Sequence, residues 1–129
     1  MTDTTFISGA CSIPVTAATL FAGGEMGSFK NPEGVTVIIT RAVLYTTTPA
    51  TAGGTNLSIG VAADAVTSAT NIYNAGDADD TAGTAVNCLA VGDAADALVT
   101  MTSSQYITVT GSADTVGFTG RLYIQYKRV

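Results

Sequence analysis

The segment GFTGRLYIQYKR, at residues 117 to 128, alternates apolar and polar side chains with a period of two. In an extended strand such a period places successive side chains on opposite faces, one buried and one in solvent. The segment therefore predicts a half-buried antiparallel β-strand, which needs further strands to cover its apolar face. The expected inward residues are Phe118, Leu122, Ile124 and Tyr126, and the expected outward residues are Thr119, Arg121, Tyr123, Gln125 and Lys127.

Two further segments, LSIGVAA at 57 to 63 and QYITVTG at 105 to 111, alternate in the same way. Both are rich in β-branched residues, which suit a pleated surface. Each predicts a strand with one buried face. The expected inward residues are Leu57, Ile59, Val61 and Ala63 in the first, and Ile107 and Val109 in the second, opposite Tyr106, Thr108 and Thr110.

Two more segments predict strands with irregularities. The run VTVIITRAVLYTTT, at 35 to 48, has consecutive apolar residues around Ile38, and a β-bulge or bend there would reconcile its two halves. In CSIPVT, at 11 to 16, Cys11, Ile13 and Val15 form the apolar face. Pro14 lacks an N–H group, which restricts this strand to an edge or an end of a sheet.

Turn-forming groups separate these segments at short intervals, and helix signals are nearly absent. About seven or eight strands at this spacing predict an all-β, antiparallel β-sandwich or barrel. A helical turn or so is expected at 68 to 75 and at 93 to 98. The expected turns are AGGEMG at 22 to 27, NPEG at 31 to 34, PATAGG at 49 to 54 and GSAD at 111 to 114.

The chain of 129 residues has the length of one domain. Its first ten residues carry Phe6 and Ile7 among small polar residues. We expect residues 1 to 10 to form an N-terminal arm, because chain ends without a continuous apolar pattern often lie outside the core. Residues 11 to 129 are then a single β-sandwich domain.

Charged residues are sparse, at 12% of the chain, and the net charge is −5. A monomer usually keeps a surface with about 25–35% charged residues. One interpretation is that Thr, Ser and Asn solvate this surface alone; we favour another, that copies of the chain or a larger assembly cover much of it. Nucleic-acid binding is not expected, because the only adjacent basic residues are Lys127 and Arg128.

The residue types also argue against catalysis. The chain has no histidine, which removes the most common general base and most transition-metal sites. Its only glutamates, Glu25 and Glu33, fall in expected turns. Cys11 and Cys88 are expected to be separate buried thiols rather than a disulfide or a zinc site. We therefore expect no enzyme activity, no cofactor and no small-molecule substrate.

The sequence has neither a run of about 18 apolar residues that would span a membrane nor the basic and apolar regions of a signal peptide at its start. We expect a protein that is made in a cytoplasm and has no membrane partner.

The loop after residue 74 is acidic. Asp77, Asp79 and Asp80 place carboxylates at spacings that a Ca²⁺ ion can use. An EF-hand loop counted from Asp77 would require Gly at its sixth position and Glu at its twelfth, where this chain has Ala82 and Cys88. We favour a solvent-exposed connection and keep calcium binding as the alternative.

Two stretches resemble a known family. TNLSIGVAADAVTSATNIYNAGDAD, at 55 to 79, and GFTGRLYIQYKRV, at 117 to 129, resemble segments of the capsid decoration, or cement, proteins encoded beside the major capsid gene of tailed bacteriophages. The resemblance implies a jelly-roll-like β-sandwich that binds the major capsid protein on the outer surface of an icosahedral head and stabilises it. It further implies a homotrimer without catalytic residues, located on the virion. Phe6 and Ile7 in the arm would suit contacts with a neighbouring subunit or the capsid.

Two other interpretations stay open. One is the β-sandwich head of a virion fibre or tail protein that binds a host receptor or glycan, with Tyr45, Tyr73, Tyr106 and Tyr123 as candidate stacking residues, although cross-strand packing is their more common role. The other is a coat or tube subunit, which the lack of a long helix disfavours.

Overall fold

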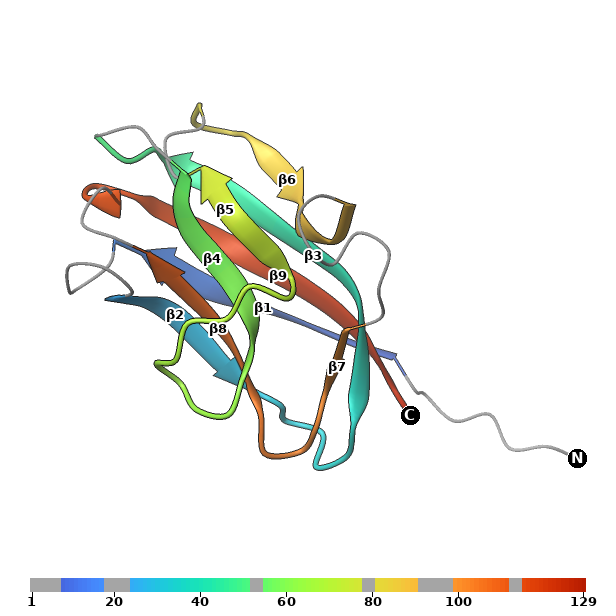
Figure 1. Ribbon diagram of the computed structural model, residues 1–129. Helices are drawn as coiled ribbons and strands as arrows, with labels where there is room; N and C mark the ends of the chain where they lie inside the picture. Colours follow the sequence, from blue (N-terminus) through green and yellow to red (C-terminus); the bar gives the residue numbers. More distant parts are fainter. Residues whose placement is uncertain (1–7, 18–23, 52–54, 78–80, 91–98, 112–114) are drawn as a thin grey trace, which may run out of the picture.

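Strand β9 (Thr119–Arg128) lies between two strands from the first half of the chain, β1 (Ser8–Thr16) and β3 (Val37–Thr48), and pairs antiparallel with both. This computed structural model describes residues 8–17, 24–51, 55–77, 81–90, 99–111 and 115–129. Two short strands, β6 (Ala85–Asn87) and β7 (Val99–Met101), also pair with β3 and complete a five-stranded sheet (Figure 1).

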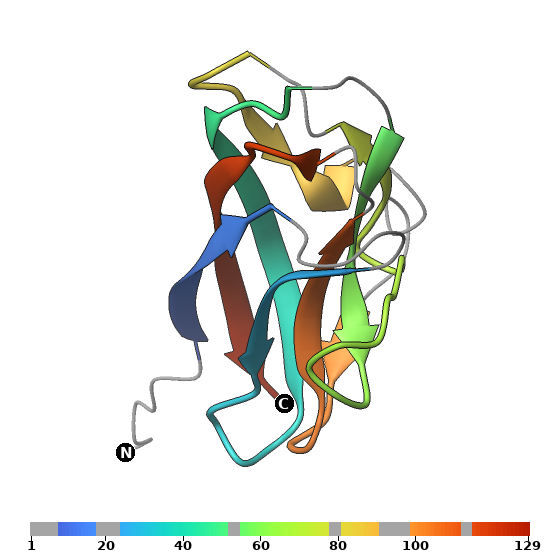
Figure 2. The ribbon, with the colours of Figure 1, turned by 90° about the vertical axis from the view of Figure 1, so that its left-hand side faces the viewer.

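A four-stranded sheet packs against the first, so that the predicted all-β sandwich is confirmed. Figure 2 shows the two layers from the side, with β9 and β3 in one layer and β8 and β4 in the other. One turn of 3₁₀ helix, η1 (Cys88–Ala90), follows β6. The strand order of the second sheet is β2 (Gly24–Lys30), β8 (Tyr106–Gly111), β4 (Thr55–Ala62) and β5 (Tyr73–Asp77).

The order of pairing identifies the sandwich as jelly-roll-like. β1 pairs with β9, β2 with β8, β3 with β6 and β7, and β4 with β5. The pairs are nested, as if one long antiparallel hairpin had been wrapped into two sheets, and this is the arrangement of a jelly roll. The described residues form nine strands rather than seven or eight, because β6 and β7 pair with different parts of β3 in place of one continuous strand.

The alternation predicted for the last strand is confirmed. Leu122, Ile124 and Tyr126 are buried, Phe118 is buried just before β9 begins, and the five polar-face residues are exposed. The inward residues of both sheets form one core between the layers. β1 is an edge strand, as Pro14 predicted, and Pro14 lies opposite Arg121 on its only partner strand.

The irregularity expected in the 35–48 segment lies at Thr40, two residues beyond Ile38. The pairing with β9 shifts between Ile39 and Arg41, where two outward residues of β3 oppose one of β9. Ile39 is buried before the bulge and Ala42 after it, while Thr40 and Arg41 are both exposed. The bulge therefore keeps both apolar halves of β3 on the core side.

Several local predictions are wrong. Residues 24 to 27 of the expected AGGEMG turn belong to β2, so Glu25 lies in a strand. Residues 68 to 75 form no helical turn, because β5 begins at Tyr73 and pairs with β4. Residues 8 to 10, assigned to the arm, lie in β1, where hydrogen bonding to β9 outweighs their weak apolar pattern. Residues 1 to 7 and 93 to 98 lie outside the described residues.

Residues 63 to 72 fold back over the outer face of the four-stranded sheet. The hydroxyl groups of Thr108 and Thr110, on β8, donate to the Thr67 carbonyl at 2.8 Å and to Ser68 Oγ at 2.9 Å. Both threonines are consequently buried, although the alternation of β8 placed them on a polar face. The jelly-roll sheet is thus covered on its outer side by the chain's own loop.

Internal hydrogen bonds hold this loop in place. Asp64 Oδ1 accepts hydrogen bonds from the Val66 and Thr67 backbone N–H groups at 2.9 and 2.7 Å. Asn71 Oδ1 accepts from the Val61 N–H group at 2.7 Å. The strand beneath ends at Ala62, so that Ala63, expected on the apolar face, is exposed while Ala62 is buried.

Asn31 joins three segments at the end of the sandwich where β4 ends, because Lys30 and Ala62 both pair with Tyr106. Its side chain is buried, and its Nδ2 donates to the carbonyl oxygens of Val35, Met101 and Thr102 at 2.8, 3.1 and 3.0 Å. Its Oδ1 accepts from the Glu33 N–H group at 2.9 Å. One side chain therefore makes four hydrogen bonds to the backbone, of which the one to Met101 is buried and the other three are partly buried.

We predict that Gly60→Ala destabilises the protein. A Cβ at this position would lie 2.6 Å from the Ala69 backbone and 2.5 Å from Asn71 Oδ1, so the loop would have to move away from β4. Overpacking of this kind costs about 1–3 kcal/mol. Urea denaturation measures the loss, with Ser58→Ala on the same strand as the control. Equal stabilities of the two variants would contradict the close approach.

We also predict that Asn31→Ala lowers the free energy of unfolding by about 2–3 kcal/mol, because it removes four hydrogen bonds to the backbone, one buried and three partly buried. Asn87→Ala removes the same chemical group from an exposed position on β6 and should change stability by less than about 0.5 kcal/mol. Thermal and urea unfolding of both variants give the comparison. A similar small loss for both would show that Asn31 is not a structural junction.

Candidate interaction surface

The sequence-predicted site residues are mostly outside the described chain. Phe6, Ile7, Asp79 and Asp80 belong to the undescribed ranges, and Asp77 is described only as the last backbone position of β5. Among the described residues, no group of three or more His, Cys, Asp or Glu side chains could hold a metal ion. The sequence-predicted contact and calcium-binding residues therefore stay predictions.

The two cysteines are separate, as expected. Cys88 is buried and Cys11 half-buried, and both are free thiols. Burial raises the pKa of Cys88 to about 12 and that of Cys11 to about 11. Both thiols are therefore protonated near neutral pH, and the protonated form is a poor nucleophile.

The outer face of the five-stranded sheet is the most distinctive exposed surface of the described chain. None of its strands, β1, β3, β6, β7 and β9, contains an acidic residue, although the chain has twice as many acidic as basic residues. Three of the five basic residues point outward from this face. We call this surface the basic face, and its main exposed side chains are Arg41, Tyr45, Arg121, Tyr123, Gln125 and Lys127.

Strand register brings these residues together. Arg41 lies opposite Gln125, and Tyr45 lies opposite Arg121. Lys127 lies two residues beyond Gln125 on the same face of β9, so that it is near Arg41 across the β3–β9 pair, with the bulge at Thr40 between them. The Arg121 guanidinium is oriented by a hydrogen bond of 2.8 Å to Ser12 Oγ on β1.

Two tyrosines give the basic face apolar area. Tyr123 is 46% exposed and Tyr45 is 38% exposed, and they are diagonal neighbours because Val43 lies opposite Tyr123. Tyr73 and Tyr106, the other tyrosines singled out from the sequence, are half-buried on the opposite sheet. Aromatic side chains with an exposed face and a polar tip are enriched in protein interfaces.

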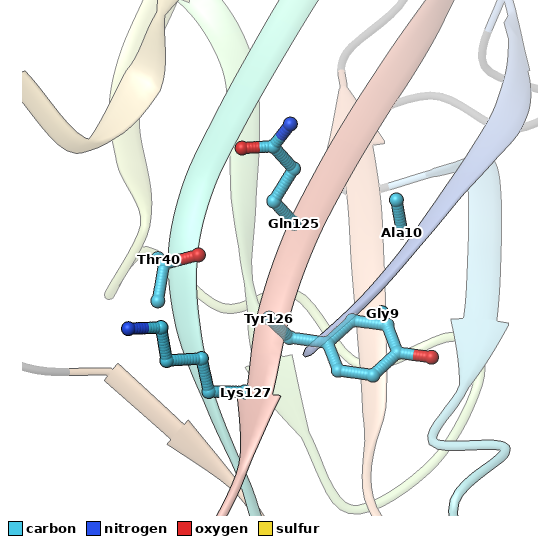
Figure 3. Close-up of a pocket in the computed structure, with 6 residues that line it drawn as sticks. All are labelled: Gly9, Ala10, Thr40, Gln125, Tyr126 and Lys127. Atoms are coloured by element: carbon cyan, nitrogen blue, oxygen red, sulfur yellow. The ribbon is translucent and has the colours of Figure 1, made fainter. Parts of the chain in front are cut away.

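A shallow depression of about 490 Å³ opens on the basic face. In Figure 3 the side chains of Thr40 and Lys127 lie beside each other between β3 and β9, with Gln125 further along β9. Its polar side chains bring the hydroxyls of Thr40 and Tyr126, one amide and one ammonium, and no carboxylate side chain lines it. The complete lining is Gly9, Ala10, Thr40, Gln125, Tyr126 and Lys127.

The basic face is not evident as a unit in the sequence. Lys127 and Arg128 are the only adjacent basic residues in the chain, yet their side chains have different surroundings. Arg128 forms an ion pair with Glu33, the only ion pair within the described part of the chain, whereas Lys127 faces outward. The outward positions of Arg121 and Lys127 were already predicted by the alternation of β9, and the place of Arg41 depends on the bulge at Thr40.

Glu33 connects the NPEG turn to the end of β9. The Tyr126 hydroxyl donates to Glu33 Oε2 at 2.7 Å, and the Arg128 guanidinium binds Oε1. These hydrogen bonds, that from Tyr126 first, lower the pKa of Glu33. Burial, together with the hydrogen bond to Glu33, raises the pKa of Tyr126 to about 12. Glu33 is therefore a structural carboxylate rather than an acid–base group.

The described residues include no helix long and apolar enough to cross a membrane. Comparisons of this chain with protein-family models, with curated proteins and with solved structures found no significant match.

We predict that Glu33 makes stability depend on pH in acid. Its pKa is lower in the folded state, so the stabilisation is present above the unfolded-state value of about 4.3 and is lost as pH falls through the folded-state pKa. The stability difference between wild type and Glu33→Gln should therefore narrow as pH falls from about 6 to about 2. Unfolding at several pH values measures this difference.

Glu25→Gln is the matched control, because Glu25 accepts only a 3.3 Å hydrogen bond from Ser28 and has no cation partner among the described residues. Its effect on stability should be smaller than that of Glu33→Gln near neutral pH. A constant difference between wild type and Glu33→Gln across the acid range would contradict the role of the Glu33 carboxylate.

Proposed function

We propose that this protein is a structural virion component, a capsid decoration or cement protein that binds the outer surface of an icosahedral phage head. It stabilises the head through contacts with the major capsid protein and performs no catalysis. The observation that carries this proposal is the basic face, a broad, exposed sheet surface with aromatic and basic side chains and no acidic residue on its strands. Such a surface suits attachment to another protein.

The fold supports the proposal at the level of architecture. Jelly-roll sandwiches occur widely in viral capsid and lectin domains, but a fold does not by itself specify a function. The stretch that resembles decoration proteins, residues 55 to 79, contains β4, the covering loop and β5. Its Gly60, Asp64 and Asn71 have structural roles in that loop, so the resemblance supports a shared domain fold rather than a shared contact.

The proposal includes self-association as a homotrimer and contacts made by Phe6 and Ile7 in the N-terminal arm. Repeated attachment of identical subunits increases binding through effective concentration, even where each single contact is weak. The low fraction of charged residues, 12% of the chain, is compatible with a protein whose surface is partly covered in an assembly.

A glycan- or receptor-binding head of a fibre is the second candidate. It is favoured by one observation, the pair of exposed tyrosines, Tyr45 and Tyr123, on the same face as the polar depression. Aromatic rings of this kind can stack on sugars. The two candidates differ in copy number, because a cement protein covers the head whereas a fibre is present in a few copies.

We predict that purified virions contain this protein in a copy number comparable to that of the major capsid protein. Quantitative gel densitometry or mass spectrometry of the virions of the phage that encodes it measures the ratio. A particle reconstruction should show its density on the outer head surface. A handful of copies per particle, with density confined to the tail, would reject the cement function and support the fibre candidate.

A further inference from the structure

We propose that the basic face is the attachment surface and that it docks on a carboxylate-rich surface of a partner protein. This inference deepens the proposed function by naming the contacting sheet and the chemistry of the partner. It follows from where the described residues place their charges. The described acidic residues lie in the four-stranded sheet, in the NPEG turn and in the covering loop, whereas Arg41, Arg121 and Lys127 share the opposite sheet.

The three outward cations are available to a partner. No carboxylate within the described ranges forms an ion pair with any of them, because the one ion pair there joins Arg128 and Glu33. The strands of the basic face carry these three outward cations and no acidic residue. A locally positive surface of this kind favours association with acidic surfaces and disfavours docking on basic ones.

The depression provides a seat for a partner carboxylate. The Lys127 ammonium, the Gln125 amide and the Thr40 hydroxyl line it, and each of these groups can donate a hydrogen bond to a partner carboxylate. Arg41 lies opposite Gln125 at the same level of the sheet. Tyr123 and Tyr45 continue the surface toward Arg121, so that the cations flank an apolar centre in the manner of a protein interface.

The size of the face fits repeated weak contacts. The sheet is four strands wide, because β6 and β7 both pair with β3. Strand β9 has ten residues. At about 3.3 Å per residue and about 4.8 Å between strands, the flat area of the face is on the order of 600 Å². Standard interfaces bury about 800 Å² on each partner. One subunit alone therefore binds weakly, and occupancy depends on many equivalent sites.

A nucleic acid is a poorer occupant than a protein. Phosphate binding draws its strength from several cations that follow the backbone, and this face has three over a strand length of about 20 Å between Arg121 and Lys127. A second copy of this chain, docked by its acidic loops, is the other alternative. The experiment separates both from the proposed partner.

The test compares single charge reversals on and off the face. Arg41→Glu, Arg121→Glu and Lys127→Glu alter the basic face, and Lys30→Glu makes the same change of charge at an exposed position on β2, in the other sheet. The probe is immobilised poly-L-glutamate at about 20 mM and about 150 mM salt. Circular dichroism and thermal unfolding confirm that each variant is folded.

The wild type should bind poly-L-glutamate at the lower salt concentration in spite of its net negative charge, and should lose most of this binding at the higher one. Each reversal on the face should weaken binding at least about fivefold, and Lys30→Glu less than about twofold. Equal weakening by all four variants, or no binding by the wild type, would overturn the inference. Tighter binding to double-stranded DNA would also overturn it.

Two further measurements identify the occupant. Sedimentation velocity should show that the reversals leave self-association unchanged; loss of a salt-sensitive oligomer in the face variants alone would assign the face to a second copy. Co-sedimentation with purified heads should be weakened by the face variants and not by Lys30→Glu. If the face variants bind heads as well as the wild type does, the inference is wrong and the proposed function stands. If the wild type binds poly-L-glutamate but not heads, the proposed function is wrong.

Discussion

The pairing of β9 with both β1 and β3 is the constraint on which the rest of the structure depends. It joins the end of the chain to two segments from its first half. The registers of these two pairings determine which face of the central strands points to the core. A shift of one residue would turn Leu122, Ile124 and Tyr126 outward and bury Arg121 and Lys127. The same register therefore determines the core and the basic face together.

The two sheets treat their outer faces differently. The four-stranded sheet is covered by residues 63 to 72, and its outward Thr108 and Thr110 are buried in hydrogen bonds to that loop. On the five-stranded sheet, Arg41, Tyr123 and Lys127 remain exposed. A hydroxyl can be buried when it finds an acceptor, whereas an unpaired cation is costly to bury. The loop thus covers the sheet face that carries Thr108 and Thr110, and the sheet face that carries the three cations remains exposed.

Net charge alone is a poor guide to what such a molecule binds. A charge of −5 argues against the continuous phosphate contacts of nucleic-acid binding. It does not describe the basic face, because a partner meets the local potential of one surface rather than the average over the chain. Glu33 forms an ion pair with Arg128, so only Lys127 of the adjacent basic pair contributes to the basic face. That face combines residues up to 86 positions apart in the sequence, Arg41 and Lys127, because β3 pairs with β9.

The sequence by itself determined the all-β class, the inward residues of the last strand and the edge position of β1, because these follow from period-two alternation and from the missing N–H of Pro14. The alternation of the last strand also predicted that Arg121 and Lys127 point outward. Only the tertiary structure decided that β6 and β7 share β3, that a loop covers Thr108 and Thr110, and that Arg41 joins the basic face through the bulge at Thr40. These features depend on pairing between distant segments, which local patterns do not encode.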